Sequence, residues 1–319
     1  MGFLKRQFLP VGLVLAALVG LVFPGPGRFM ATLPTQYVAV SLIFLVSGLL
    51  LRTDEVKAAL AAWPATLWGS LSILLVTPLI GSAIAFQVPI DPSFRLGLAL
   101  FCCMPTTLSS GIALTGQARG NVALALLLTL LTNTVGIVTV PFVMAHLLGA
   151  LGQVELSGTD LLFKLCFSIL LPLGVGKYLQ RFCRDWVGRN RSQLGMLNNA
   201  ALILIPWMKF SQSSAQLRQV ALDNLALLVA AGVGIHVLYL LLNDGACRLL
   251  RLAGGARKAV VLLASQKTLP VAMTVLAFLP DEAVPPETKG LIAIPCITFH
   301  LSQIFLDAFI ATRWGNAAD

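Results

Sequence analysis

The sequence has little charge. Asp, Glu, Lys and Arg make up 11% of its 319 residues, whereas they make up roughly a quarter of an ordinary soluble domain. Hydrophobic residues account for 57% of the chain, and the mean hydropathy is +0.88. A soluble enzyme of ordinary composition is therefore excluded, and a polytopic membrane protein is expected. A transmembrane β-barrel is disfavoured, because apolar runs of about twenty residues replace the two-residue alternation that barrel strands need.

The sequence also lacks the short motifs that mark metal, nucleotide and hydrolase sites. None of its six cysteines forms a Cys-x-x-Cys pair, so we interpret them as small core residues. No phosphate-binding loop, His-Glu-x-x-His motif or Gly-x-Ser-x-Gly motif is present. We therefore predict no enzyme activity, no catalytic residues and no metal or cofactor other than a coupling ion, Na⁺ or H⁺. The net charge of +9 fits basic residues in cytoplasmic loops better than a nucleic-acid partner, which is not expected.

Long apolar segments joined by Gly, Pro, Asn and Asp fill most of the chain. The expected fold class is an all-α polytopic membrane protein. At about twenty residues per span, ten transmembrane helices are predicted, at residues 7–23, 33–51, 64–86, 94–117, 120–148, 158–180, 194–213, 222–246, 257–279 and 290–311. Lys5 and Arg6 precede the first apolar run, as in a signal peptide. No small-residue cleavage site follows them, so this segment is predicted to be retained as the first helix.

The basic residues are distributed unevenly between the two ends of these helices. With the N-terminus in the cytoplasm, fifteen of the 22 Lys and Arg residues lie at cytoplasmic ends and five at the opposite ends. Cytoplasmic loops of membrane proteins carry such an excess. We therefore predict a multi-pass protein of the inner or plasma membrane with both termini in the cytoplasm.

An odd number of spans in each half predicts an internal symmetry. Five helices per half invert the second half, which predicts one transporter domain built from two inverted repeats, residues 1–152 and 153–319. Pro105 lies in the fourth predicted helix and Pro270 in the ninth, the matching position of the second repeat. Proline removes a backbone donor and breaks a helix, and paired breaks of this kind point to a binding site. We expect the site where broken helices 4 and 9 cross.

Hydroxyl side chains surround the first of these breaks. Pro105 is followed by Thr106, Thr107, Ser109 and Ser110. A break exposes amides at one half-helix end, which suit anions, and carbonyls at the other, which suit small cations. We predict a role for this cluster in substrate or ion binding. The alternative is that the hydroxyls only satisfy backbone groups that Pro105 has freed.

The second break contains a cation. Ser265, Gln266, Lys267 and Thr268 precede Pro270, and a charge at the centre of a span costs about 2.5–3.5 kcal/mol on insertion scales. Lys267 could pair with a substrate anion, occupy the position of a coupling cation, or exchange a proton, since burial disfavours its charged form. The structural alternative is a lysine bound to carbonyls of the broken helix.

Two further polar groups are weaker candidates. Thr129, Thr132 and Asn133 form a strip in the fifth helix that could face Pro105, although threonine in membrane helices often bonds its own backbone. His300 and Gln303 share a face of the last helix with Asp307, which suggests a proton relay. The alternative, slightly favoured, is that Asp307 reaches Arg313.

Two other residues are interpreted without a functional role. His236, alone in the middle of its span, is expected to be a packing residue with its hydrogen bonds satisfied. Lys209 lies close to Trp207, and its ammonium is expected to extend past the ring towards the membrane interface.

At these residues the sequence resembles the bile acid:sodium symporter superfamily, in the branch of the seventh human bile-acid solute-carrier member and its bacterial relatives. The resemblance spans the whole chain and rests on Ile43 to Leu49 with Arg52 to Glu55, Cys103-Met104-Pro105, Ser109-Ser110, Ala118 to Asn121, and Ser265 to Leu269. It implies ten helices, a core and a panel domain, crossing unwound fourth and ninth helices, and sodium-coupled uptake of organic anions.

Four positions depart from the sodium-coupled pattern of that superfamily. The family's ninth-helix glutamate is replaced by Leu262, and the asparagine after the glutamine by Lys267. The fourth-helix Ser-Asn pair is Ser109-Ser110, and one fifth-helix hydroxyl position is Ala125. The hypothesis is that the Lys267 ammonium takes the place of a bound cation, which makes transport sodium-independent or proton-linked.

The sequence therefore predicts a secondary transporter that moves an organic anion across the cytoplasmic membrane by alternating access. Its expected partners are the small organic anion and the lipid bilayer, and the protein is expected to be a monomer or a homodimer. The coupling ion stays open between sodium, proton and none. Two alternatives are a membrane regulatory protein without sodium-coupled transport and a membrane enzyme acting on lipid-linked substrates.

Overall fold

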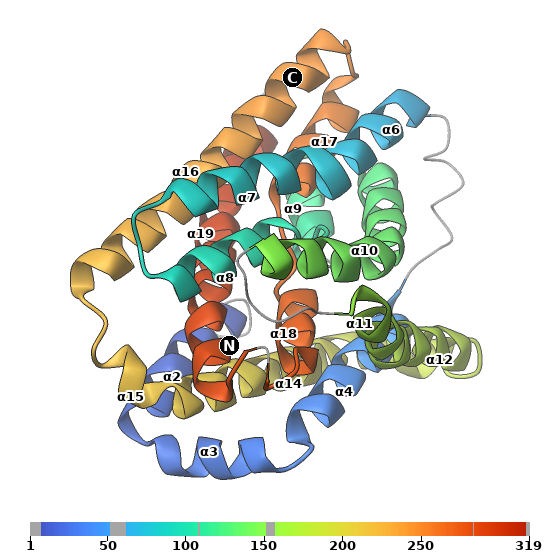
Figure 1. Ribbon diagram of the computed structural model, residues 1–319. Helices are drawn as coiled ribbons and strands as arrows, with labels where there is room; N and C mark the ends of the chain where they lie inside the picture. The colour runs from blue at the N-terminus through green and yellow to red at the C-terminus, as the bar shows by residue number, and fades with distance from the viewer. Residues whose placement is uncertain (1–7, 52–61, 108, 151–156, 283, 317–319) are drawn as a thin grey trace. The chain divides into compact units, whose positions relative to one another are not determined.

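The computed structural model describes residues 8–51, 62–107, 109–150, 157–282 and 284–316. These residues form helices and short connections, without a strand among them (Figure 1). The predicted motif from Arg52 to Glu55 lies outside the described residues.

Helices occupy all ten predicted segments within the described part of the chain. They are α2 (Phe8–Val22), α4 (Thr35–Leu50), α6, η2 and α7 (Trp63–Leu71, Ser72–Val76, Thr77–Gln87), α8 and α9 (Pro92–Cys102, Ser110–Gln117), α10 (Val122–Ala150), α11, η3 and α12 (Gly158–Leu165, Cys166–Leu170, Leu171–Gln180), α14 (Arg191–Gln212), α16 (Leu222–Leu249), α17 and α18 (Gly254–Ser265, Leu269–Phe278) and α19 (Pro286–Asn316). Three short helices join them: α3 (Pro24–Thr32), α13 (Arg184–Arg189) and α15 (Ser214–Leu217).

Six of the described helical segments are long and apolar enough to cross a membrane, and seven if the bent pair α2 and α3 counts as one span. The protein is therefore a multi-pass membrane protein. α4 and α8 are apolar but shorter, and for α8 the reason is the break after Cys102. The ten-span count and the inverted repeat stay predictions.

The connection between the first two predicted helices, residues 7–23 and 33–51, is itself helical. The chain bends by 99° between α2 and α3, but it continues at once as a helix in which Pro24 occupies the first turn. Proline suits this position because the first backbone N–H groups of a helix have no intrahelical partner.

Close contacts divide the chain into two compact units, each of which draws on both halves of the sequence. Unit 1 comprises Met1–Leu51, Pro141–Ala221 and Pro270–Ile294, and unit 2 comprises Arg52–Val140, Leu222–Leu269 and Pro295–Asp319. The predicted repeats do not coincide with these units and stay predictions.

In unit 1, α14 packs along α2, α3 and α4, and α12 packs along α4. Val46 of α4, Val187 of α13 and Leu194 of α14 form a small buried cluster.

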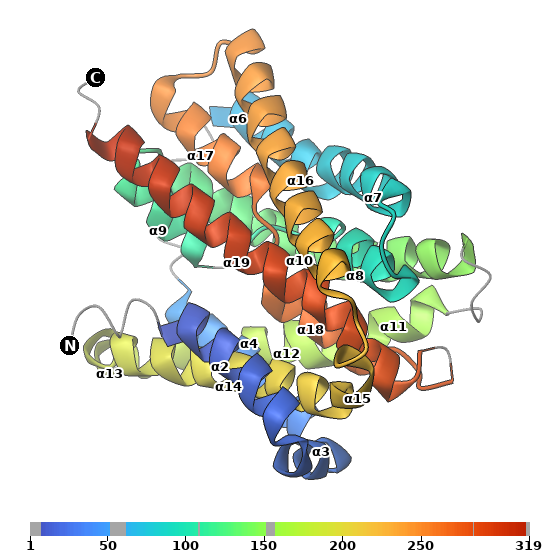
Figure 2. The same cartoon turned by 90° about the vertical axis from the view of Figure 1, so that its left-hand side faces the viewer.

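In unit 2, α17 packs against α16, α6 and α9, and α16 and α17 run side by side in Figure 2. A large apolar cluster fills the space between them and includes Ile73, Leu114, Leu128 and Leu262. Unit 2 thus holds the first break and the residues up to Leu269 of the second.

Candidate functional site

The first predicted break is present in unit 2. α8 ends at Cys102, α9 begins at Ser110, and the residues from Cys103 to Thr107 between them are buried. The hydroxyl of Thr106 donates to the carbonyl oxygen of Leu263 at 2.6 Å, and the hydroxyl of Thr107 donates to Oε1 of Gln266, also at 2.6 Å. Both threonines therefore bind the segment that contains the second break.

The second break lies between α17 and α18. α17 ends at Ser265 and α18 begins at Leu269, so Gln266, Lys267 and Thr268 are not helical. The backbone N–H of Thr268 donates to the carbonyl oxygen of Pro105 at 2.9 Å. The two breaks thus satisfy each other's free backbone groups in a buried part of the protein, as membrane depth requires.

Gly111 allows the two breaks to approach so closely. A Cβ atom at this position would lie 2.9 Å from Oγ1 of Thr107 and 3.1 Å from Oε1 of Gln266. The backbone N–H of Gly111 itself donates to Oγ1 of Thr107 at 3.0 Å. A side chain here would push apart the two groups that join the breaks.

A chain of hydrogen bonds continues from Gln266 into α19 and α16. Nε2 of Gln266 donates to Oδ2 of Asp307 at 2.6 Å, and Oδ1 of Asp307 lies 2.9 Å from Nε2 of His236. Nδ1 of His236 lies 3.1 Å from the carbonyl oxygen of Ser265. Asp307 and His236 are fully buried.

This geometry limits the charge of the His236–Asp307 pair. A carbonyl oxygen can only accept, so Nδ1 of His236 carries a proton. The contact with Asp307 also holds one proton, either on His236, which gives an ion pair, or on Asp307, which gives a neutral pair. The pair has no net charge in either case.

Lys267 is the buried cation of the site. Its side chain is 0% exposed, and Nζ donates to the carbonyl oxygen of Ile73 at 3.2 Å and to Oγ1 of Thr77 at 2.9 Å. The ring of Tyr239 lies beneath it, with its centroid 5.8 Å from Nζ. These groups are neutral, and Lys267 forms no ion pair with any carboxylate in the described ranges.

The acceptor for Lys267 is created by a local irregularity of the preceding helix. η2 has π-helical hydrogen bonding, in which the N–H of Thr77 bonds the carbonyl oxygen of Ser72, five residues earlier. The next bond of this register would join residue 78 to Ile73, but residue 78 is a proline without an N–H. The carbonyl oxygen of Ile73 is thus left free for Lys267. The lysine therefore binds a helix carbonyl, as the structural alternative predicted, but one from η2 rather than from the broken helices.

Gln303 fixes the backbone around Lys267. Its Oε1 accepts from the backbone N–H of Lys267 at 2.9 Å, and its Nε2 donates to the carbonyl oxygen of Lys267 at 2.6 Å. Nε2 of Gln303 also lies 3.0 Å from Nδ1 of His300. The predicted neighbours His300 and Gln303 are therefore in contact, whereas Asp307 takes part in the separate chain through His236.

Among the candidate residues from the sequence, three buried oxygen atoms have no hydrogen-bond partner in the described part of the chain: Oγ1 of Thr129, Oδ1 of Asn133 and Oγ1 of Thr268. Nδ2 of Asn133 donates to the carbonyl oxygen of Thr106 at 3.0 Å, so the polar strip of α10 does reach the first break. Thr132 instead donates to Leu128 of its own helix at 2.8 Å, as the backbone-bonding alternative predicted. Unpartnered buried oxygens are costly and suit a bound donor or cation.

The remaining predicted positions lie outside this network. Ser109 is exposed and Ser110 half-buried, and their hydroxyls bind no described side chain or backbone group. Leu262 and Ala125, the two positions at which the sequence departs from the sodium-coupled pattern by lacking a carboxylate and a hydroxyl, are fully buried in the apolar cluster of unit 2. Apolar side chains therefore stand at both positions, and neither offers an oxygen ligand to a cation.

Two interpretations from the sequence are wrong in detail. Asp307 does not reach Arg313, whose guanidinium lies over the ring of Phe309 instead; Asp307 is buried against His236 and Gln266. Lys209 does not extend to the membrane interface, because it is 3% exposed. Ile73, Thr77 and Tyr239 were not predicted from the sequence; the proline at residue 78 is a local signal for the first two only.

Known proteins are similar to this sequence along nearly its whole length. The profile of the SBF-like CPA transporter family (DUF4137) matches residues 7–316. The probable sodium/metabolite cotransporter BASS4 of Oryza sativa subsp. japonica, a chloroplastic protein, is 37% identical over 98% of this chain and 76% of its own length.

More distant relatives come from bacteria and animals. The putative symporter YfeH of Escherichia coli K12 is 25% identical over 95% of this chain and 91% of its own. The sodium/bile acid cotransporter 7 of Rattus norvegicus is 25% identical over 96% of this chain and 92% of its own. These names indicate a secondary transporter of a small solute rather than an enzyme.

Proposed function

The chain belongs to the SBF-like CPA transporter family, and on this basis we propose that it carries a small organic anion across the cytoplasmic membrane by alternating access. The proposed site is the place where the broken helices cross. Bile acids and many metabolites are carboxylates, so the names of the relatives favour an anionic substrate.

The uncompensated charge of Lys267 carries this proposal. The His236–Asp307 pair has no net charge, and the partners of the Lys267 ammonium are the neutral Ile73 and Thr77. Burying an unpaired cation costs several kcal/mol, by an order-of-magnitude estimate. A chain keeps such a group where it serves a pathway or a ligand. A substrate carboxylate brought to the crossing would supply the missing negative charge.

The charge of Lys267 also affects which ion is coupled to transport. In our proposal the Lys267 ammonium takes the place of a coupling cation, and transport is sodium-independent or linked to a proton on Lys267. The apolar packing of Leu262 and Ala125 supports this, because those positions offer no oxygen to sodium. The relatives named as sodium cotransporters make sodium coupling the competing outcome.

The neighbouring polar groups have proposed roles around this cation. Thr106 and Thr107 join the two broken segments through their hydrogen bonds. The unpartnered oxygens of Thr129, Asn133 and Thr268 would bind polar groups of the substrate. Gln303 and His300 position the backbone of Lys267. Ser109 and Ser110, which are more exposed, would contact the substrate only at the edge of the site.

Transport in proteoliposomes tests the proposal. Counterflow of a labelled bile acid and of small aliphatic carboxylates is measured with sodium and with choline as the external cation. The wild-type protein is expected to accumulate one of these anions equally well with either cation. Lys267→Met is expected to lower its uptake at least about tenfold, since a hydrogen-bonded charge contributes about 1.5–3 kcal/mol.

Lys258→Met is the matched control, because it removes a lysine from the same helix α17 outside the crossing. It is expected to keep most of the uptake. Sodium stimulation that persists undiminished in Lys267→Met would refute the role of Lys267 as a substitute cation. The absence of counterflow for every anion would refute the transport proposal itself.

A further inference from the structure

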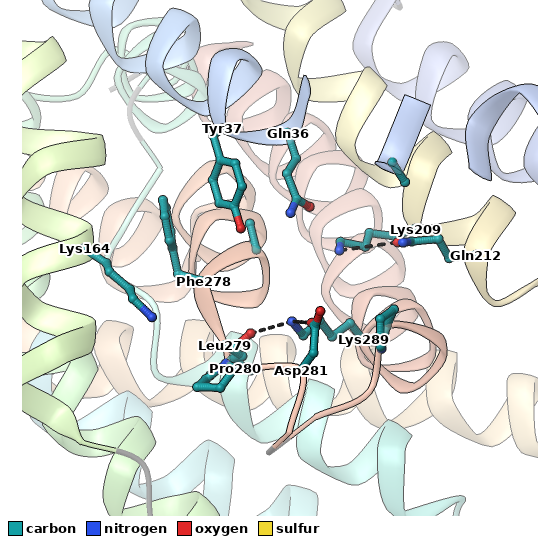
Figure 3. Close-up of a pocket in the computed structure, with 13 residues that line it drawn as sticks. Gln36, Tyr37, Lys164, Lys209, Gln212, Phe278, Leu279, Pro280, Asp281 and Lys289 are labelled. Atoms are coloured by element: carbon teal, nitrogen blue, oxygen red, sulfur yellow. Dashed lines mark hydrogen bonds and ion pairs between the residues drawn. The ribbon is translucent and has the colours of Figure 1, made fainter. Parts of the chain in front are cut away.

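Unit 1 contains a cavity of its own, built from residues that the crossing does not use. Its volume is about 320 Å³, within the range of small-molecule sites. Figure 3 shows Gln36 and Tyr37 of α4, Lys164 of α11 and Lys209 of α14 around one space. The end of α18 and the start of α19 complete it, and Lys289 enters from the latter.

Three lysines and one aspartate set the charge of this cavity. Lys289 is buried, and its Nζ donates to Oδ1 of Asp281 at 2.5 Å and to the carbonyl oxygen of Leu279. Asp281 therefore balances Lys289. Lys164 is exposed at the edge, and Lys209 is 3% exposed.

Asp281 also acts on the charge of Lys209, but from a greater distance and without an ion pair. Nζ of Lys209 has one hydrogen-bond partner among the described residues, the neutral Oε1 of Gln212, at the long distance of 3.5 Å. No described carboxylate forms an ion pair with it. Lys209 is therefore a buried cation with a weak neutral partner, aimed into a cavity large enough for a ligand.

The fold forces these charges together. A Cβ atom at Gly290 would lie 2.5 Å from the carbonyl oxygen of Lys209, so α19 and α14 meet almost backbone to backbone at this point. The hydroxyl of Ser213 also bonds the carbonyl oxygen of Glu287 across the same contact. This close approach of α14 and α19 brings Lys209 of the first helix near Lys289 of the second.

An aromatic wall faces the cations. The rings of Tyr37 and Phe278 are in contact, with centroids 5.0 Å apart, and both line the cavity (Figure 3). Tyr37 is 41% exposed, so the cavity reaches the surface at this side. A ligand that fits has an apolar body against the rings and an anionic end at Lys209.

We propose that this cavity is a second anion site, which binds a small organic carboxylate with Lys209 as its counter-ion. The carboxylate accepts hydrogen bonds from Lys209 and the amide of Gln212 or Gln36, and its hydrocarbon part packs on Tyr37 and Phe278. The site lies in unit 1, whereas the crossing lies in unit 2. The proposal therefore holds or fails independently of the transport proposal.

Equilibrium dialysis of the purified full-length protein with labelled benzoate tests this site, with benzamide as a neutral molecule of the same shape. Wild-type protein is expected to bind benzoate and to bind benzamide at least about tenfold more weakly, since a charge-assisted hydrogen bond is lost. Lys209→Met is expected to weaken benzoate binding to the same degree. The same loss is expected when Lys209→Met is introduced into a Lys267→Met background, in which the cation of the crossing is absent.

Three results would overturn the proposal. One is equal binding of benzoate and benzamide, which would make the cavity merely apolar. Another is equal binding of benzoate to wild-type protein and Lys209→Met. The third is displacement of benzoate by millimolar chloride or phosphate alone, which would make it a site for inorganic anions. If Lys209→Met does not fold, the comparison of benzoate with benzamide on Lys267→Met protein still decides, because the cation of the crossing is absent there.

Discussion

At the scale of single residues, the His236–Asp307 pair shows how hydrogen-bond geometry limits charge. Asp307 is hydrogen-bonded to both Gln266 and His236, and Nδ1 of His236 donates to the carbonyl oxygen of Ser265. An uncharged side chain of the same shape can meet both partners. In the Asp307→Asn variant the new amide oxygen would accept from Gln266, and the new amide nitrogen would donate to Nε2 of a neutral His236.

Two substitutions at this position separate hydrogen bonding from charge. Asp307→Asn is expected to lower the free energy of unfolding by no more than about 1 kcal/mol, because both hydrogen bonds survive. Asp307→Leu leaves two buried donors unpartnered and is expected to cost about 3 kcal/mol or more. Thermal unfolding in detergent measures both. Equal stability of the two variants would contradict the proposed geometry.

At the scale of elements, the helix breaks at Pro105 and before Pro270 are stabilised because the two broken segments pack together and hydrogen-bond to each other. Gly111 makes that fit possible, since a Cβ atom would lie within 3.1 Å of both Thr107 and Gln266 side-chain oxygens. Gly116 lies on the same helix α9, but there the nearest atom to an added Cβ would be Cγ2 of Val122 at 3.6 Å, an ordinary contact.

The two glycines of α9 therefore form a matched pair. Gly111→Ala is expected to lower stability by about 1–3 kcal/mol through overpacking and to reduce uptake with it. Gly116→Ala is expected to be neutral or stabilising by up to about 1 kcal/mol, because alanine favours the helix. Melting temperatures and counterflow of the two variants check this. A stable, active Gly111→Ala would show that the breaks tolerate separation.

At the scale of the whole molecule, charge predicts orientation. Fifteen basic residues at one set of helix ends against five at the other predict cytoplasmic termini. Green fluorescent protein fused after Asp319 is therefore expected to fluoresce, and alkaline phosphatase at the same position to be inactive. A truncated fusion after Gln153 is the control and is expected to give the reverse pattern. Identical patterns at both positions would contradict the predicted topology.

Local sequence signals were enough to predict the helices, their approximate ends and the two breaks. Apolar runs, proline and glycine affect the conformation of residues near them in the chain, so helices and their ends can be predicted from short stretches of sequence. Lys267 was identifiable for the same reason, as a charge in an apolar run. Even the break after Cys102 could be placed from Pro105 alone.

The binding partner of each polar side chain, in contrast, follows from how the helices pack in three dimensions. Lys267 meets Ile73 across 194 residues of sequence, and His236 meets Asp307 across 71. Such pairs depend on the rotation and crossing of packed helices, which local signals do not specify. The same holds for Lys209. Its position in the sequence suggested a membrane interface, but the contact of α14 with α19 at Gly290 places it inside a cavity.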